Sequence, residues 1–139
     1  MVPTDRVDAA LTAALEGADG VVSAYMFGSV ARGRAHRESD VDIGVLLDWR
    51  VHPLAPDRFE ARLRLAAFLQ AAVGRHVDVV ILNDAPPHLG RQIMTAGRRL
   101  VVADPTLDHA HLRVTLSRAA DLEPFLKRAR AIKLAALAP

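Results

Sequence analysis

Three aspartates lie in or next to two apolar segments, and their type and spacing are typical of a catalytic or metal-binding site. Asp40 and Asp42 stand one residue apart at the head of the apolar run "VDIGVLL", and Asp78 is the second residue of "VDVVIL". In a strand, residues i and i+2 project from the same face, where like charges repel and where Asp is disfavoured. A charge in an apolar strand is costly unless it is paired or bound to a metal. The pattern therefore indicates a ligand for these carboxylates.

A divalent cation is the ligand that such paired carboxylates favour. Mg²⁺ takes oxygen ligands and commonly binds carboxylates together with substrate phosphates. For Asp40 and Asp42 alone, the alternative is an exposed strand face or a capping turn. If the two strands lie side by side in one sheet, Asp78 joins the pair. Three carboxylates then predict a two-magnesium site for in-line phosphoryl displacement, in which the third carboxylate takes the proton of an attacking hydroxyl.

A Gly-Ser corner precedes the aspartates and predicts where phosphates bind. Gly28 and Ser29 follow the apolar run "VVSAYMF". Glycine allows torsions and close approaches that a Cβ forbids, and backbone N–H groups at such a turn attract phosphate. Arg32 and Arg34 add positive charge nearby. Alone, such a corner is usually only a turn; next to the carboxylates, it predicts a triphosphate site.

Alternating helical and strand patterns predict the elements that position these residues. Apolar runs predict strands over Val21–Phe27, Val41–Leu47, 77–82 and 98–104. Helical periodicity predicts helices over 4–17, with Thr4 as N-cap, over 57–73 and over 86–97. The buried side of the second helix is expected to carry Phe59, Leu63, Leu65, Ala66 and Leu69. The fold class is therefore α/β or α+β, with a small mixed sheet of about four strands flanked by helices.

The C-terminal third is predicted to be a helical extension, residues 106–139, of a single domain over 1–139. Pro124 is expected to divide it into helices over 106–120 and 122–136, because proline disrupts a helix interior. An apolar stripe recurs at three- and four-residue spacing in its second half, formed by Leu122, Phe125, Leu126, Ala129, Ile132 and Ala136. The stripe lies opposite Lys127, Arg128, Arg130 and Lys133. It either packs on the protein's own core or docks a partner.

Composition excludes several classes of protein. The 139 residues are 51% hydrophobic and contain no Cys, which excludes a disordered chain and a thiolate site. With neither a long apolar run nor a secretory N-terminal pattern, the sequence predicts a cytoplasmic protein without a membrane partner. The net charge is +2 and aromatic residues are few, so no direct nucleic-acid partner is expected. The scattered histidines (36, 52, 76, 88, 109 and 111) predict surface or capping roles.

The stretch "GSVARGRAHRESDVDIGVLL" resembles the signature of the DNA polymerase β-like nucleotidyltransferase superfamily: Gly-Ser, ten residues, then Asp-x-Asp. It is most similar to the minimal nucleotidyltransferase (MNT) family. The matching positions are Gly28, Ser29, Ala31, Arg32, Gly33, Ser39, Asp40 and Asp42. Asp78 stands in the strand where that family keeps its third carboxylate. The similarity continues through "VDVVILNDAPPHLGRQIMTAGRRLV" and "DLEPFLKRARAIKLAAL", so it covers most of the chain.

This resemblance implies a nucleotidyltransferase, and specifically a protein adenylyltransferase that acts as an antitoxin. Such MNT proteins pair with a HEPN-domain ribonuclease toxin and transfer AMP from ATP to a tyrosine hydroxyl near its active site. By that similarity, Asp40 and Asp42 would ligate both Mg²⁺ ions. Asp78 would ligate the catalytic ion and help to deprotonate the tyrosine, while Gly28 and Ser29 would hold the β- and γ-phosphates.

The resemblance also implies lesser roles and leaves alternatives open. Arg32 either contacts phosphate or buttresses the turn, Gly33 belongs to the nucleotide-binding motif, and Ser39 caps or orients Asp40. One alternative function is an antitoxin that acts by binding and occlusion, without catalysis. Another is a small-molecule nucleotidyltransferase, for instance one that modifies an aminoglycoside, although the residues beyond Val102 leave little room for the further domain that such enzymes usually carry.

Overall fold

A four-stranded mixed sheet forms the centre of the computed structural model, which describes residues 6–28 and 40–138. The strands are β1 (Val21–Phe27), β2 (Val41–Leu47), β3 (Val77–Ile81) and β4 (Arg98–Val102). They lie in the order β3-β2-β1-β4. β1 is antiparallel to both β2 and β4, whereas β2 and β3 are parallel. The predicted fold class is confirmed.

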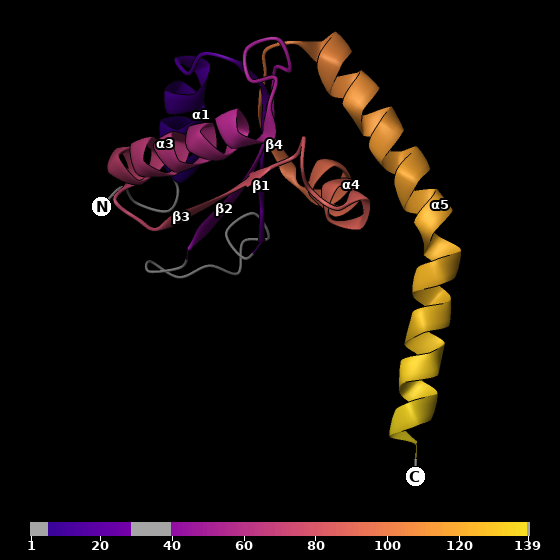
Figure 1. Ribbon diagram of the computed structural model, residues 1–139. Helices are drawn as coiled ribbons and strands as arrows, with labels where there is room; N and C mark the ends of the chain where they lie inside the picture. Colours follow the sequence, from indigo (N-terminus) through magenta and orange to yellow (C-terminus); the bar gives the residue numbers. More distant parts are fainter. Residues whose placement is uncertain (1–5, 29–39, 139) are drawn as a thin grey trace.

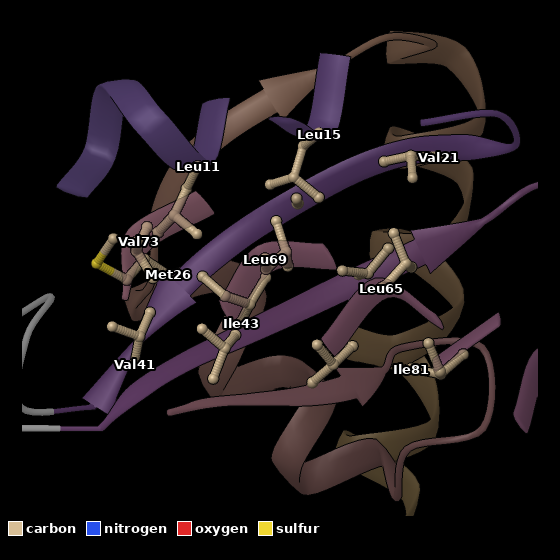
Figure 2. Packing of buried hydrophobic residues seen from close by; sticks show 14 of the residues in the cluster. Leu11, Leu15, Val21, Met26, Val41, Ile43, Leu65, Leu69, Val73 and Ile81 are labelled. Carbon is tan, nitrogen blue, oxygen red and sulfur yellow. The ribbon is translucent and has the colours of Figure 1, made fainter. Parts of the chain in front are cut away.

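Helices cover both faces of this sheet (Figure 1). On one face lie α1 (Val7–Glu16) and α3 (Ala55–Val73). On the other lie α4 (Pro87–Ala96) and the first part of α5 (Pro105–Leu137). The main core forms between the sheet and the α1/α3 layer, and Figure 2 shows Leu11, Ile43 and Leu69 meeting there. Alternate β2 residues enter this core, so the intervening ones, Asp42 and Gly44, face the opposite side.

The crossover through α3 makes the parallel pairing of β2 and β3 possible, because parallel strands need a long connection. α3 ends at Gly74, whose φ of 66° allows the left-handed turn at the helix C-terminus. The Gln70 side chain then accepts a hydrogen bond from the N–H of Val77 at 3.2 Å. This contact ties the end of α3 to the start of β3. The crossover therefore sets where β3 begins against β2.

The buried face of α3 differs from the one expected. Leu65 and Leu69 are buried as predicted, but Phe59 and Leu63 are 54% and 55% exposed, so that part of the prediction is wrong. The buried positions are Arg58, Ala61, Leu65, Leu69 and Val73. The stripe is displaced because Arg58 is held inside by Asp84, whose carboxylate accepts two hydrogen bonds from the guanidinium at 2.8 and 2.9 Å.

Most element ends agree with the sequence pattern to within two residues. β1 and β2 have the predicted bounds, and α3 begins two residues early, at Ala55. β3 and β4 end at Ile81 and Val102, slightly before their predicted ends. α1 begins at Val7 with Arg6 at its N-cap position, and Thr4, the expected N-cap, lies outside the described residues.

The predicted break at Pro124 is wrong. α5 is one helix of 33 residues with Pro124 inside it, and Figure 1 shows that it bends part-way along. Proline removes one backbone hydrogen bond and crowds the carbonyl four residues earlier. That carbonyl belongs to Ala120, which is exposed, so water can satisfy it and a bend relieves the contact. Within residues 6–28 and 40–138, no helix has both the length and the apolar character that a membrane span needs.

A buried hydrogen bond joins α5 to the sheet. The Tyr25 hydroxyl on β1 donates to Asp108 Oδ1 on α5 at 2.5 Å, and both residues are almost fully buried. Burial raises the pKa of Tyr25 to about 12, and the hydrogen bond and negative charge of Asp108 act in the same direction. This bond therefore anchors the first part of α5 against β1.

We predict that the Tyr25 hydroxyl loses its proton only at strongly alkaline pH, and that its hydrogen bond to Asp108 is lost there. Because the pKa of Tyr25 is raised in the folded state, its contribution to stability is present below pH 10 and is lost as the pH rises toward about 12. Tyr25 is the only tyrosine, so tyrosinate absorbance should show a native midpoint near 12 and an unfolded midpoint near about 10. Asp108→Asn should lower the native midpoint part of the way. A native midpoint near 10 would contradict the buried bond.

No residue in the second half of α5 is fully buried in the described structure. The buried residues of this helix are Asp108, Thr115 and Ala119, and each of the later ones is exposed or half-buried. The predicted apolar stripe therefore does not pack on the core, and the core interpretation is not supported.

Truncation after Asp121 should accordingly leave the fold intact. The lost contacts are surface ion pairs around Glu123, which contribute at most about 1 kcal/mol each. We expect the melting temperature to fall by no more than about 5 °C, measured by circular dichroism. Aggregation or a much larger loss would show that the segment belongs to the core after all.

Candidate active site

Asp42 and Asp78 lie side by side on the sheet. The parallel register pairs Asp42 of β2 with Asp78 of β3, and the antiparallel register pairs Phe27 of β1 with Asp42. One row across three strands therefore contains Phe27, Asp42 and Asp78. Neighbouring strands lie about 4.8 Å apart, so the two carboxylates can reach a common ligand. The sheet brings together the aspartates that were predicted to meet.

Helix α4 covers the next row, whereas Asp40 and Asp78 remain exposed among the described residues. That next row pairs Gly44 with Tyr25 on one side and with Val80 on the other. A Cβ at Gly44 would collide with the side chain of Ile93 on α4, which shows how closely the helix approaches there. The aspartates lie one row nearer the end of the sheet. Asp78 keeps a side-chain exposure of 57% and can receive a substrate.

Asp40 and His76 complete the acidic cluster. They precede β2 and β3, respectively, and are held together because the Val41 N–H donates to the His76 carbonyl at 3.0 Å. His76 Nδ1 lies 3.7 Å from Asp40 Oδ2, and its Nε2 lies 3.8 Å from Asp78 Oδ1. One ligand atom from each of Asp40, His76 and Asp78 falls within 4.8 Å of the others. The imidazole thus bridges two of the predicted carboxylates.

His76 is a residue that the sequence pattern did not select. The histidines have no metal-ligand spacing, and surface or capping roles were predicted for them. A usable signal was present, because His76 is two residues before Asp78 and directly precedes the same strand. Its position depends on the register of β2 and β3, which no local pattern reveals.

The donor set fits a hard divalent cation. Asp40, Asp42 and Asp78 supply carboxylate oxygens, the ligands that Mg²⁺ prefers. The exposure of Asp40 and Asp78 leaves coordination positions for water and for phosphate oxygens. The His76 nitrogen would suit Zn²⁺ better than Mg²⁺. The ligand atoms that lie close enough to share an ion come from Asp40, His76 and Asp78, and Asp42 stands next to Asp78 in the sheet.

Of the Gly-Ser corner that was predicted to bind phosphates, the structure describes Gly28. The local geometry leaves no room for a side chain at this position. Its φ is 78°, a left-handed conformation, and a Cβ there would collide with Asp42 Oδ2. The backbone at the corner therefore lies directly against the Asp42 carboxylate. Ser29, Arg32, Gly33 and Ser39, the other predicted nucleotide-binding residues, lie outside the described residues.

A cleft of ≈ 300 Å³ begins at this corner and runs beside α4. It is lined by Phe27, Gly28, Leu89, Gln92, Ala96, Gly97 and Arg98. Its walls combine apolar side chains with the amide of Gln92 and with Arg98, whose guanidinium pairs with Asp8 at 2.9 Å. Such a cleft can hold a flat, largely apolar group with a polar edge. No sequence signal marked Gln92, because a single glutamine on a helix has no distinguishing pattern.

The comparison with known proteins defines the class to which this site belongs. Residues 10–106 match the family described as Polymerase beta, Nucleotidyltransferase. This match covers more than half of the chain, and the chain belongs to that family. The Gly-Ser corner and the three aspartates, Asp40, Asp42 and Asp78, all lie within the matched residues.

A curated relative has a more narrowly defined activity than the family as a whole. The chain is 40% identical over 78 residues to the protein adenylyltransferase MntA of Shewanella oneidensis (strain ATCC 700550), a match that covers 55% of this chain and 50% of that protein. The chain thus matches about half the length of this curated relative.

Two solved structures share the fold over nearly their whole length. A toxin-antitoxin crystal structure with AMP-PNP is 29% identical, with a TM-score of 0.71, and the match covers 94% of this chain and 98% of that one. The toxin-antitoxin structure MntA-HepT is 25% identical, with a TM-score of 0.66, and the match covers 96% of this chain and 99% of that one.

Gly28→Ala should damage the site more than the fold. The new Cβ would be strained at positive φ and would push against the Asp42 carboxylate, so we expect a loss of about 1 kcal/mol of stability and clearly weaker Mn²⁺ binding. Gly17→Ala is the matched control, because a Cβ there meets nothing closer than 3.8 Å. Mn²⁺ affinity is measured by titration calorimetry. An unchanged affinity in Gly28→Ala would show that the backbone at Gly28 does not affect how the carboxylates bind metal.

Proposed function

We propose that this chain is a protein adenylyltransferase that transfers AMP from ATP to a tyrosine hydroxyl of a HEPN-domain ribonuclease toxin, and so acts as its antitoxin. The observation that carries the proposal is the in-register pair Asp42 and Asp78, with Gly28 directly against Asp42. The relative named as a protein adenylyltransferase supports the reaction. The toxin-antitoxin structures of similar fold support the kind of partner.

The carboxylates account for the chemical step. Asp40, Asp42 and Asp78 would hold two Mg²⁺ ions, which supply electrostatic stabilisation of the attacking and leaving oxygens. The tyrosine oxygen forms a bond to the α-phosphorus of ATP, and the bond from that phosphorus to the bridging oxygen of pyrophosphate breaks. Asp78 would accept the hydroxyl proton; its exposure on the edge strand supports this role, because an incoming hydroxyl can reach it there. Pyrophosphate is the leaving group.

The corner and the cleft account for ATP binding. The backbone at Gly28 would contact the phosphates beside Asp42, in accord with the predicted role of the Gly-Ser turn. The nucleoside would occupy the cleft beside α4, where Phe27 and Leu89 offer apolar contact and the Gln92 amide offers both a donor and an acceptor to the base. Ser29, Arg32, Gly33 and Ser39 keep their predicted roles as the rest of the nucleotide-binding motif.

The intact mass of a co-expressed HEPN-domain partner tests this function directly. Transfer adds one or more AMP groups to the partner and requires ATP and a divalent cation. An antitoxin that acts by occlusion would instead silence the ribonuclease without changing its mass. A small-molecule nucleotidyltransferase, such as one acting on aminoglycosides, would neither bind nor modify the partner. Each alternative thus has its own outcome.

Asp40→Asn combined with Asp42→Asn should abolish transfer while the fold persists. The double variant loses metal ligands, so we expect the rate to fall by more than roughly a thousandfold. Relief of like-charge repulsion should keep the melting temperature unchanged or raise it. Asp19→Asn with Asp121→Asn is the control, since it removes the same charge from exposed positions. Transfer near the wild-type rate in the double variant would refute the mechanism.

Asp78→Asn should retain ATP binding but lose most of the transfer rate. Asp78 acts on the incoming hydroxyl, and loss of a general base typically costs about 10²–10⁴ in rate. Single-turnover kinetics and ATP-analogue affinity, measured on the same variant, separate the two effects. A parallel loss of affinity and rate would place Asp78 in the phosphate site instead.

A further inference from the structure

The second half of α5 has an apolar face that no described residue covers. Leu122 is 41% exposed, and Phe125 and Ile132 are each 64% exposed. Figure 1 shows this half projecting away from the sheet and its other helices. An isolated helix of this length is marginal in water, and large side chains of this kind are costly to leave in solvent. The face therefore calls for a partner surface.

The exposed face continues the one with which α5 packs on its own protein. Thr115 of α5 lies against Gly90 of α4, where a Cβ would be 3.1 Å from its methyl group. Leu122 follows Thr115 by seven residues and so lies on the same side. Glu123 still contacts α4, since its carboxylate is 3.9 Å from His88 Nδ1. Farther along α5, the large apolar residues Phe125 and Ile132 are each 64% exposed.

The spacing on this face is that of a helix–helix interface. Leu122, Ala129 and Ala136 recur every seven residues, and Phe125 and Ile132 have the same interval. Repeats of seven residues keep one seam toward a neighbouring helix, and the alanines would permit close approach. The geometry thus favours a helix of another molecule over an extended strand or a small ligand.

The charges indicate which helix fits. The region from Leu122 to the C-terminus carries four basic side chains, those of Lys127, Arg128, Arg130 and Lys133, and one acidic side chain, that of Glu123. Arg130 already pairs with Glu123 at 3.0 Å. Two copies of this chain would bring like charges together. A partner whose apolar ridge is flanked by Asp and Glu would be attracted instead.

The direction of α5 relates this face to the active site. Figure 1 shows that α5 begins near the opposite end of the sheet and extends, on the far side of α4, in the direction of the end where β1 ends and β2 begins. Asp40 lies at that same end, directly before β2. A protein seated on the projecting half of α5 would therefore lie toward the same end of the molecule as the aspartates.

We propose that Leu122, Phe125, Ala129 and Ile132 form a docking face for a helix of the acceptor protein, an apolar helix flanked by acidic residues. Docking there holds the acceptor hydroxyl in line with the α-phosphate, and such positioning supplies much of the rate in group transfer. The inference rests on the proposed function for the identity of the acceptor, a HEPN-domain toxin. The face itself is argued from exposure, spacing and charge.

The test compares two charge insertions on opposite sides of α5. Phe125→Glu with Ile132→Glu alters the docking face, whereas Ala120→Glu with Ala131→Glu adds the same two charges to exposed positions on the outer side. Each full-length chain is co-expressed with a HEPN-domain toxin. Co-purification, the mass of the toxin and the binding of AMP-PNP by the chain alone are then measured. Circular dichroism verifies that each variant is folded.

We expect the docking-face variant to bind the toxin at least roughly tenfold more weakly and to leave it largely unmodified, with AMP-PNP binding unchanged. The outer-face variant should match the wild type. Equal effects of both variants would overturn the proposal. So would a wild-type dimer that the docking-face variant converts to a monomer with toxin binding intact, since the face would then serve a second copy. A wild-type chain that binds the toxin through this face without transferring AMP would refute the proposed function and leave the docking face standing.

Discussion

The parallel register of β2 and β3 is the constraint on which the site depends. Asp42 and Asp78 are 36 positions apart in the chain and meet because that register pairs them directly. A slip of one residue would turn one carboxylate to the core side of the sheet. The register is held by the core as well as by the backbone, since Ile43 and Val79 enter the same layer against α1 and α3. Burial of the valines and isoleucines thereby positions two charges on the opposite face.

Two glycines determine how closely other segments approach these charges. At Gly28 the backbone turns directly against the Asp42 carboxylate, and at Gly44 the side chain of Ile93 fills the space of a missing Cβ. One glycine brings the phosphate corner to the aspartates, and the other lets α4 pack flat over the next row. The result is an acidic row beside a cleft that Gly28 and Gln92 both line. Close packing and an open site are compatible here because they occupy adjacent rows of one sheet.

Helix α5 combines an anchored half with a projecting half. Asp108 fixes the first half through its hydrogen bond with Tyr25, deep between helix and sheet. On the other face of the sheet, the ion pair between Arg58 of α3 and Asp84 similarly fixes the segment before α4. Beyond Glu123 the helix has no such attachment in the described structure. The first half of α5 is thus anchored on the sheet, and its second half presents an exposed apolar face that is suited to binding another protein.

The sequence by itself determined the elements, the sheet class and the three aspartates, because alternation, apolar periodicity and a charge inside an apolar strand are local signals. It also indicated the Gly-Ser corner through its motif. Only the tertiary structure decided that His76 joins Asp40 and Asp78, that Gln92 lines a cleft at Gly28, and that Phe59 and Leu63 stay exposed. These depend on register and on which side of α3 is buried, where Arg58, paired with Asp84, lies inside in place of Phe59 and Leu63. The continuity of α5 through Pro124 was not predicted either. A helix bend near the exposed Ala120 carbonyl relieves a clash that the local pattern counted as a break.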